Sequence, residues 1–533
     1  MNDQIYGIDL GTTYSSIARI NDLDQAEIIR NTEGDFTTPS VVYFEESGNV
    51  VVGKQAKQVL VADPDNGVAL IKRQIGTVHP LEYRGTAYTP ESISALILKE
   101  IVNAANIETG ENIEKVLITV PAYFGIQERE ATKQAGEIAG LEVVGIVTEP
   151  VAAALSIGIG SQEMQRLFIY DLGGGTFDTT IMKVGDGKVE VVAVDGNRML
   201  GGADWDQALI DLISEKFIQQ AGLGDDDPRY DEGYLGELRR DAEQTKQSLT
   251  KRDSVTVRCR YNEADEQITV TRTEFEDATK HLVDQTIDIC KRATALAESK
   301  EPGITVDKFL LVGGSSRMPM IAEALKAQLG LDPIPTDYDL AVAKGAAIYG
   351  QTAVDEVLST DGEAPAGAAA DGAEPAAPKF YLGGASTLQV SNVISKALGV
   401  HFFHDENDTI GYISFIAHSN DSIPMVADTI EAATLADNQT AVNLAIYEQR
   451  GEKESEDPAS NELLKSVALT VPPLPKESPI EIAFTVTAEG LVRCKISDPA
   501  SGKFEEIEVQ TSVLSTEAVE AAKAQISGLT LRS

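Results

Sequence analysis

The chain has 533 residues, of which 42% are apolar and 24% are charged, the composition of an ordinary globular protein with several domains. Lysine and arginine number 44 against 84 aspartates and glutamates, which gives a formal net charge of −40 at pH 7. So negative a surface repels phosphate backbones and anionic lipid, which disfavours nucleic-acid and membrane partners.

The cellular setting follows from what the sequence lacks. No stretch of about 18 apolar residues is present, and the first residues carry no basic segment typical of a signal peptide. Cys259, Cys290 and Cys494 are far apart and form no C-x-x-C motif, which favours reduced, packed thiols. We therefore expect a cytoplasmic protein.

Strand-like and helix-like patterns alternate along residues 1–354. The apolar runs 116–120 and 167–171 favour strands, whereas the amphipathic stretch 127–139 favours a helix that stops at Gly140. This alternation predicts an α/β domain over residues 1–354.

Residues 6–13 and 170–176 repeat one pattern. In each, an apolar strand ends in an aspartate (Asp9 or Asp171), and a turn rich in glycine and threonine follows. The two copies lie about one domain length apart. We therefore expect two similar lobes that face each other across a cleft.

Turns of this composition suit phosphate groups. Glycine lets consecutive backbone N–H groups point at one anion, threonine hydroxyls add donors, and the paired aspartates suit a hydrated Mg²⁺ ion. Gly313-Gly314 forms a third such turn after the apolar run 309–312, and Gly201-Gly202 is a weaker fourth. The pattern predicts a nucleotide-binding cleft.

These motifs resemble those of the ATPase domain of the heat shock protein 70 chaperones, in the same order and at the same spacing. The matching segments are residues 7–14, 120–124, 149–150, 152–154, 171–178 and 311–317. The resemblance implies an actin-like, two-lobed α/β ATPase fold with ATP or ADP, Mg²⁺ and K⁺ in its cleft.

The resemblance also implies roles for individual residues. The implied catalytic residues are Lys72, Glu149, Asp171, Thr176 and Asp178, with Asp9 and Asp171 at the metal ion. The implied nucleotide-binding residues are Asp9, Gly11, Thr12, Thr13, Tyr14, Gly173, Gly174, Gly175, Gly201, Gly202, Glu243, Lys246, Gly313, Gly314, Ser315, Arg317 and Asp339. Gln247 stands where the family usually has an arginine that stacks on adenine, a contact that glutamine cannot reproduce.

Residues 355–379 consist mainly of alanine, glycine, proline and acidic residues. Such a segment cannot bury enough apolar surface to order itself, so we predict a flexible, self-repelling tether. It stands where the family has an apolar interdomain linker, and the nearest apolar run is 388–394.

The pattern of apolar residues changes after the tether. Short alternating runs at 410–416, 441–447, 467–471, 480–486, 492–496 and 505–509 predict an antiparallel β-sandwich over residues 380–512. Ser515 is placed to cap a helix over 516–526, so we expect a short C-terminal helix within 513–533 and no helical lid.

The predicted sandwich resembles the peptide-binding domain of the same family. This resemblance implies that unfolded or partly folded client proteins bind there through extended apolar segments. The residues placed by position at the pocket are Val400, Phe403, Leu435, Val442, Leu444 and Ile480. Alternation alone fits ordinary core residues equally well.

Three functions remain open at this point. The first is an ATP-dependent chaperone; the second is a nucleotide-dependent binding or regulatory module, an uncoupled holdase or co-chaperone, that docks one dedicated partner. The third, a sugar kinase or filament-forming relative, leaves the sandwich unexplained. We expect a monomer. The resemblance implies a J-domain co-chaperone and a nucleotide-exchange factor as partners, with Gly145 where the J-domain contact is typically arginine.

Overall fold

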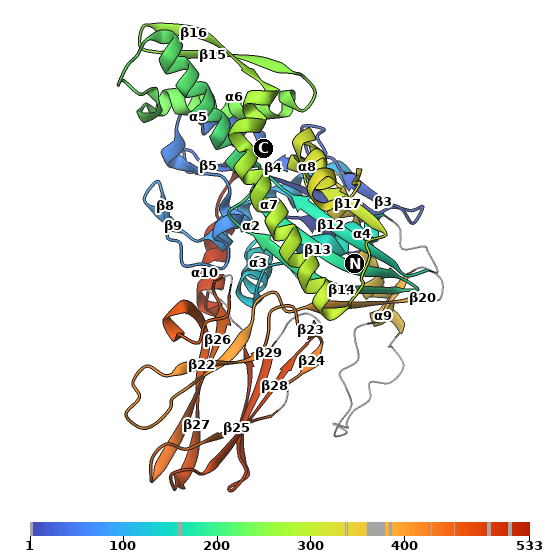
Figure 1. Ribbon diagram of the computed structural model, residues 1–533, viewed down its shortest axis with the longest axis vertical. Coiled ribbons are helices and arrows are strands. Elements are labelled where there is room, and N and C mark those ends of the chain that lie inside the picture. Colours follow the sequence, from blue (N-terminus) through green and yellow to red (C-terminus); the bar gives the residue numbers. More distant parts are fainter. Residues whose placement is uncertain are drawn as a thin grey trace.

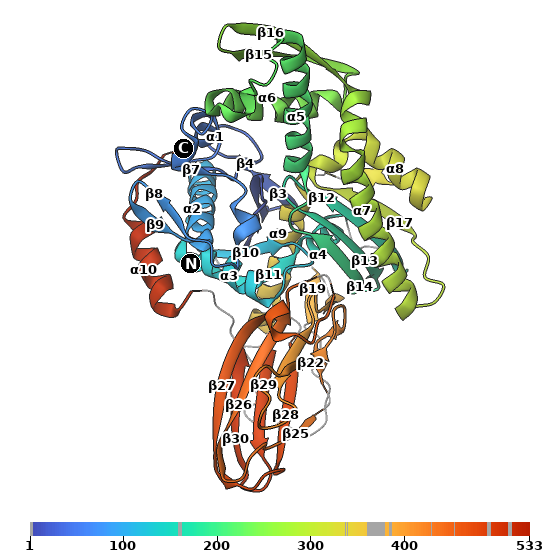
Figure 2. The same ribbon diagram turned by 60° about the vertical axis from the view of Figure 1, so that its left-hand side comes forward.

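The structure is a computed structural model in which two α/β lobes lie above a pair of antiparallel sheets (Figures 1 and 2). The described residues are 4–157, 163–335, 337, 339–359, 379–382, 386–427, 429–451, 453–487, 492–509 and 514–532. Within these ranges no helix combines the length and the apolarity needed to span a membrane.

The two lobes have the same sheet topology. In each, a three-stranded antiparallel meander is extended by two parallel strands beside its first strand. The strands of lobe I, in spatial order, are β3 (Ala26–Ile29), β2 (Tyr14–Ile20), β1 (Tyr6–Asp9), β10 (Lys115–Val120) and β11 (Glu142–Thr148). Those of lobe II are β14 (Lys188–Asn197), β13 (Phe177–Gly185), β12 (Gln165–Leu172), β17 (Lys308–Val312) and β18 (Ile334–Pro335). Because β1 and β12 hold equivalent places, the predicted sequence repeat is also a structural repeat.

Helices cover the sheets and join the lobes. The helices of this region are α2 (Pro90–Thr109), α3 (Ile126–Ile138), α4 (Glu149–Ser156), α5 (Gly202–Ala221), α6 (Glu232–Leu249), α7 (Arg272–Lys300), α8 (Pro319–Leu329) and α9 (Ala341–Ser359). Helix α9 crosses β1 so closely that a Cβ at Gly7 would lie 2.2 Å from the backbone N of Ala347. Only glycine permits this contact. With the hairpin of β15 (Ser254–Tyr261) and β16 (Ala264–Thr271), α5 and α6 form the outer end of lobe II (Figure 1).

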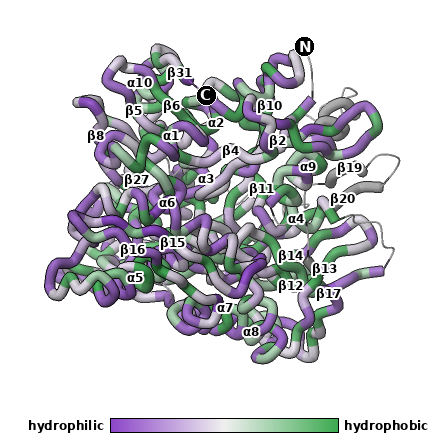
Figure 3. The backbone as a smooth tube through the Cα atoms, turned by 90° about the horizontal axis from the view of Figure 1, so that it is seen from above, coloured by the Kyte–Doolittle hydropathy of each residue, from purple (hydrophilic) through white to green (hydrophobic). Residues whose placement is uncertain are grey.

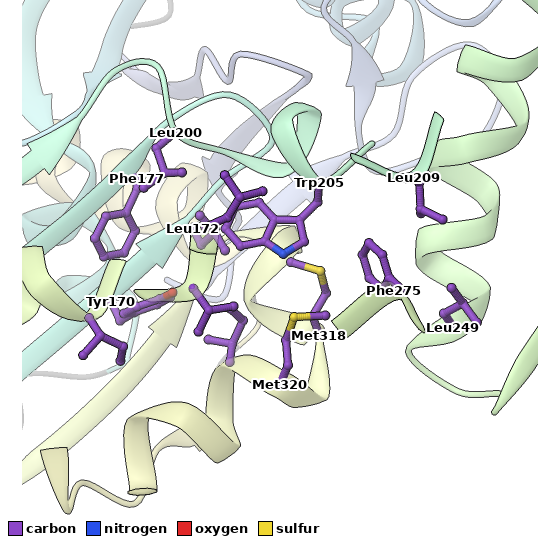
Figure 4. Close-up of a cluster of buried hydrophobic side chains, with 14 of the residues drawn as sticks. Tyr170, Leu172, Phe177, Leu200, Trp205, Leu209, Leu249, Phe275, Met318 and Met320 are labelled. Atoms are coloured by element: carbon purple, nitrogen blue, oxygen red, sulfur yellow. The ribbon is translucent and has the colours of Figure 1, made fainter. Parts of the chain in front are cut away.

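The core of lobe II surrounds the only tryptophan of the chain. Trp205 is fully buried on α5 and packs in one cluster with Leu172, Phe275, Met318 and Met320 (Figure 4). The hydropathy view shows hydrophobic stretches along β13 and β14 and hydrophilic stretches at the outer end near β16 (Figure 3). Strand β13 is accordingly buried along nearly its whole length, whereas alternate residues of β16 are exposed.

Two antiparallel sheets make up the C-terminal part. The first contains β22 (Tyr412–Ala417), β21 (Leu398–Phe402), β26 (Gln439–Gln449) and β27 (Asn461–Leu474). The second contains β24 (Met425–Val426), β25 (Ile430–Ala433), β28 (Pro479–Val486), β29 (Val492–Asp498) and β30 (Lys503–Val509). All six predicted runs overlap these strands. Leu398 and Ile446 of the first sheet share a buried cluster with Phe484 and Cys494 of the second.

The region between the two halves differs from the prediction. Helix α9 continues to Ser359, into the predicted tether, and residues 360–378 of that tether lie outside the described residues. We assigned Lys379 to the tether and residues 380–393 to the second domain. In the structure β19 (Lys379–Leu382) and β20 (Ser386–Val393) extend the sheet of lobe II.

The physical reason for this difference is the free edge of β14. Strand β20 runs parallel to it, with Val189 opposite Val390, and so satisfies backbone groups that the edge leaves unpaired. Val390 and Val393 are buried in the cluster around α4. The apolar run 388–394, the nearest to the missing apolar linker, therefore lies largely in strand β20 of the sheet of lobe II.

The C-terminal segment returns to lobe I. Helix α10 (Thr516–Ser527) begins after Ser515, whose side chain accepts a hydrogen bond from the N–H of Ala518, and it packs against α2 and α3. The strand β31 (Leu531–Arg532) then pairs in parallel with β6 (Val50–Val52). The predicted helix is therefore present, but it forms part of lobe I.

Candidate functional site

The loops after β1 and β12 meet between the lobes. We call them the first phosphate loop (residues 12–14) and the second phosphate loop (residues 173–176). A Cβ at Gly174 would lie 2.1 Å from Thr13 Oγ1, and a Cβ at Gly175 would lie 2.2 Å from Thr12 Cγ2. Only glycine allows two loops to approach this closely. The two loops therefore border the same narrow space between the lobes.

A second pair of glycines supports the loop after β12. The N–H groups of Gly202 and Ala203, at the start of α5, donate to the carbonyls of Gly173 and Gly174 over 3.0 and 2.8 Å. A Cβ at Gly201 would lie 2.4 Å from the carbonyl carbon of Gly175. We predicted Gly201 and Gly202 as nucleotide contacts, and in this structure they contact the second phosphate loop.

Four carboxylates and one lysine lie beside these loops. Glu149, Asp171, Asp178 and Lys72 are buried, and Asp9 is half-buried. Lys72 Nζ donates to Glu149 Oε1 over 2.6 Å. Burial, followed by the charge of Glu149, raises the pKa of Asp9 to about 7 and the pKa values of Asp171 and Asp178 well above their usual range. One lysine does not balance so many acidic groups.

This imbalance fits a divalent cation. Asp178 Oδ2 is buried and has no hydrogen-bond partner among the described residues. The described part of the chain holds no group of three or more histidine, cysteine or acidic side chains arranged as metal ligands. A Mg²⁺ ion is commonly held by one or two carboxylates together with water and phosphate oxygens. Asp9 and Asp171 are the residues that would hold it here.

A bridge crosses the outer part of the cleft. Tyr14 Oη donates to Glu243 Oε1 over 2.8 Å, and Lys57 of α1 (Lys54–Val59) donates to both side chains. We predicted both Tyr14 and Glu243 as nucleotide-binding residues, and the structure brings them together from opposite lobes. Sequence reasoning missed Lys57, since a lysine on a short polar helix carries no motif.

The remaining predicted residues of α6 also contact protein groups. Lys246 Nζ donates to the carbonyl of Gly202 over 2.8 Å and lies 2.8 Å from Asp206 Oδ1. It therefore supports the start of α5. Gln247, the departure from the family pattern, is exposed on the same helix.

The third glycine-rich turn adjoins the carboxylates. Gly313 has a φ of 82°, and a Cβ there would lie 2.5 Å from Asp171 Oδ1. Ser315 is buried against Gly202, and Arg317 pairs with Asp339. A Cβ at Gly314 would lie 2.8 Å from Asp339 Oδ1. The turn thus lies between Asp171, which precedes the second phosphate loop, and the Arg317–Asp339 pair.

The six residues predicted at a peptide pocket are divided by the structure. Val400, Leu444 and Ile480 lie in the closed core between the two C-terminal sheets, while Val442 is partly buried against it. Leu435 is half-buried, and Phe403 is 40% exposed. For Val400, Leu444 and Ile480 the structure therefore favours the alternative interpretation as core residues.

Two lobes of equal topology that enclose glycine–threonine loops, buried carboxylates and a lysine define a two-lobed nucleotide-binding protein. The sequence model of the family described as Hsp70 protein matches residues 5–361 and 386–527, and the chain belongs to this family. Membership supports a chaperone and ATPase function in general, with ATP or ADP and Mg²⁺ as the ligands of the family. The break in the match falls on the acidic segment between α9 and β20.

Proposed function

We propose that this chain is an ATP-hydrolysing chaperone. Its cleft binds Mg·ATP, and its C-terminal sheets form a β-sandwich that binds apolar segments of unfolded or partly folded proteins. The observation that carries the proposal is the buried Lys72–Glu149 pair beside Asp9, Asp171 and Asp178, next to the two facing loops.

Each group suits a step of phosphoryl transfer, which depends on positioning and charge neutralisation. The second loop and the hydroxyls of Thr12 and Thr13 bind the phosphates. Lys72 neutralises charge on the γ-phosphate, and Glu149 and Thr176 orient the attacking water. Asp178, whose buried Oδ2 has no hydrogen-bond partner among the described residues, takes the proton of that water. Mg²⁺ and a nearby K⁺, when bound, neutralise further phosphate charge.

The hydrolysis site is tested by Lys72→Ala and Thr176→Ala. We expect both variants to bind ATP and to lose roughly 10²- to 10³-fold in turnover, as when one group that stabilises transition-state charge is removed. Lys326→Ala, at an exposed ion pair with Asp332, is the matched control. Wild-type turnover in Lys72→Ala and Thr176→Ala would refute the assignment.

The chaperone cycle needs a separate experiment. A fluorescent apolar peptide is bound to the full chain, and its dissociation is followed after addition of Mg·ATP or Mg·ADP. Faster release with ATP supports a coupled chaperone.

We also propose that the protein is a cytoplasmic monomer that works with a J-domain co-chaperone and a nucleotide-exchange factor.

One observation favours a second candidate function. Val400, Leu444 and Ile480 are closed within the C-terminal core, which leaves little apolar surface from them for a client. In this alternative the lobes act as a nucleotide-dependent clamp, and the sheets dock one dedicated partner. Equal peptide release with ATP and ADP, or no peptide binding, would favour it.

A further inference from the structure

Two arginines beside the second phosphate loop have no role in the reaction described above. Arg73 directly follows Lys72 in the short 3-10 helix η2 (Ile71–Gln74) of lobe I. Arg198 follows β14 in lobe II. Each side chain reaches a backbone carbonyl of the opposite lobe.

Arg73 contacts the loop and its support together. Its Nε donates to the carbonyl of Gly175 over 2.8 Å, and its Nη2 donates to Asp204 Oδ2 over 2.7 Å. The same Oδ2 accepts from the N–H of Gly201 over 2.8 Å. The side chain of Arg73 is only 10% exposed, so water competes weakly for these bonds.

Arg198 holds the backbone that carries Arg73. Its Nη2 donates to the carbonyl of Arg73 over 2.6 Å and to that of Ile75 over 3.3 Å. Its Nη1 donates to Glu128 Oε1 over 3.3 Å. Hydrogen bonds from a charged donor are roughly twice as strong as neutral ones. The two arginines therefore interlock across the cleft.

The orientation of the Gly175 carbonyl determines where the next backbone N–H points. The carbonyl belongs to the same planar peptide unit as the N–H of Thr176, so fixing the oxygen also fixes the direction of that N–H. Glycine at 175 allows this peptide to turn easily. A planar guanidinium can bind the carbonyl and Asp204 at once, whereas an ammonium group is a single point charge.

We propose that Arg73 is a positioning residue for ATP hydrolysis, which sets the orientation of the Gly175–Thr176 peptide toward the γ-phosphate and is itself held by Arg198. This inference rests on the proposed ATPase function. Arg73 acts on turnover more than on nucleotide affinity, because the other loop amides and hydroxyls still bind the ground-state phosphates.

The test compares Arg73→Gln, Arg73→Lys and Arg198→Gln with Arg84→Gln in the full chain. Arg84 pairs with Asp63 on the outside of lobe I and is the matched control. Single-turnover hydrolysis measures the chemical step, a fluorescent ATP analogue measures affinity, and urea denaturation measures stability. A small misplacement of a reacting group costs up to about 100-fold.

We expect Arg73→Gln to lower kcat by about 10- to 100-fold with the dissociation constant for ATP within about threefold of wild type. Arg73→Lys restores only part of the loss, Arg198→Gln shows a smaller loss of kcat, and Arg84→Gln changes neither quantity. Full rescue by Arg73→Lys would show that charge alone suffices and would overturn the inference.

Failure of the inference and of the proposed function are distinguishable. A wild-type chain that hydrolyses ATP, with Arg73→Gln equally fast, overturns the inference alone. A wild-type chain that binds no ATP overturns the proposed function, and the inference with it. The inference is also overturned if, in Arg73→Gln and Arg73→Lys, the loss of kcat is proportional to the loss in the free energy of unfolding. A purely structural role of Arg73 then accounts for both losses.

Discussion

Replacing Lys396 with methionine tests the contact between lobe I and the C-terminal sheets. Lys396 Nζ lies 2.7 Å from Glu128 Oε1 and 3.5 Å from Glu448 Oε2. The side chains of these glutamates are only 6% and 3% exposed. Glu448 Oε1 also accepts from the N–H of Ile126 of α3 over 3.0 Å. Methionine keeps most of the side-chain length but leaves the two buried carboxylates without this shared cation.

The expected magnitude follows from the burial. Removing one partner of a buried ion pair costs about 3–5 kcal/mol. Arg198 still pairs with Glu128, which favours the lower end, about 3 kcal/mol. At about 1.4 kcal/mol for each factor of ten, the docked arrangement becomes about 100-fold less favoured.

Amide hydrogen exchange at Ile126 in the full chain measures this change. The N–H of Ile126 donates to Glu448 Oε1 across the contact between lobe I and the C-terminal sheets, so it is protected while the two are docked. We expect it to exchange about 100-fold faster in Lys396→Met. Lys326→Met, which removes an exposed pair, is the control and is expected to cost about 0–1 kcal/mol. Unchanged exchange of the Ile126 amide in Lys396→Met would refute the reasoning.

Two further predictions concern lobe I. Burial and the charge of Glu33 raise the pKa of Glu100 in α2 from 4.5 to about 7, so the folded state binds a proton that the unfolded state releases, and stability falls as pH rises between these values. Glu100→Gln removes this pH dependence and raises the free energy of unfolding by at most about 3 kcal/mol at pH 8. The prediction is contradicted if the free energy of unfolding, measured by urea denaturation, changes with pH between 5 and 8 in the variant as it does in wild type. Ile526→Ala removes a side chain of α10 that is 1% exposed in the core of lobe I. It should lower the free energy of unfolding by about 2–5 kcal/mol in urea denaturation, and a loss below about 1 kcal/mol would show that α10 does not pack there.

Local patterns explain why much of the nucleotide site could be predicted. The apolar runs 116–120 and 167–171 fall within β10 and β12, because alternating or continuous apolar residues have few ways to be buried. Gly174 and Gly175 lie against Thr13 and Thr12 because two similar strands deliver similar turns to one cleft. A repeated motif therefore predicts which two loops face each other.

Contacts between distant elements could not be predicted in this way. Lys57 and Arg73 are basic residues without a motif, and their role depends on which acceptors the opposite lobe presents. The pairing of β20 with β14 uses backbone groups, which every residue carries, so no side-chain pattern reveals the partner edge. The division of Val400 and Phe403 between core and surface fails for a related reason, since alternation does not show which face of a sheet is covered.

The two ends of the C-terminal part are anchored in different lobes. The chain enters these sheets from β20, which belongs to the sheet of lobe II, and leaves them through α10 and β31, which pack on lobe I. The lobes meet at the phosphate loops, where Gly174 lies against Thr13, so a change in the angle between the lobes changes the distance between the two anchors. Both anchors can then persist only if the C-terminal sheets move relative to at least one lobe. The buried contact of Lys396 with Glu128 opposes such movement at lobe I. The energy of that contact therefore determines how far a change in the angle between the lobes moves the C-terminal sheets.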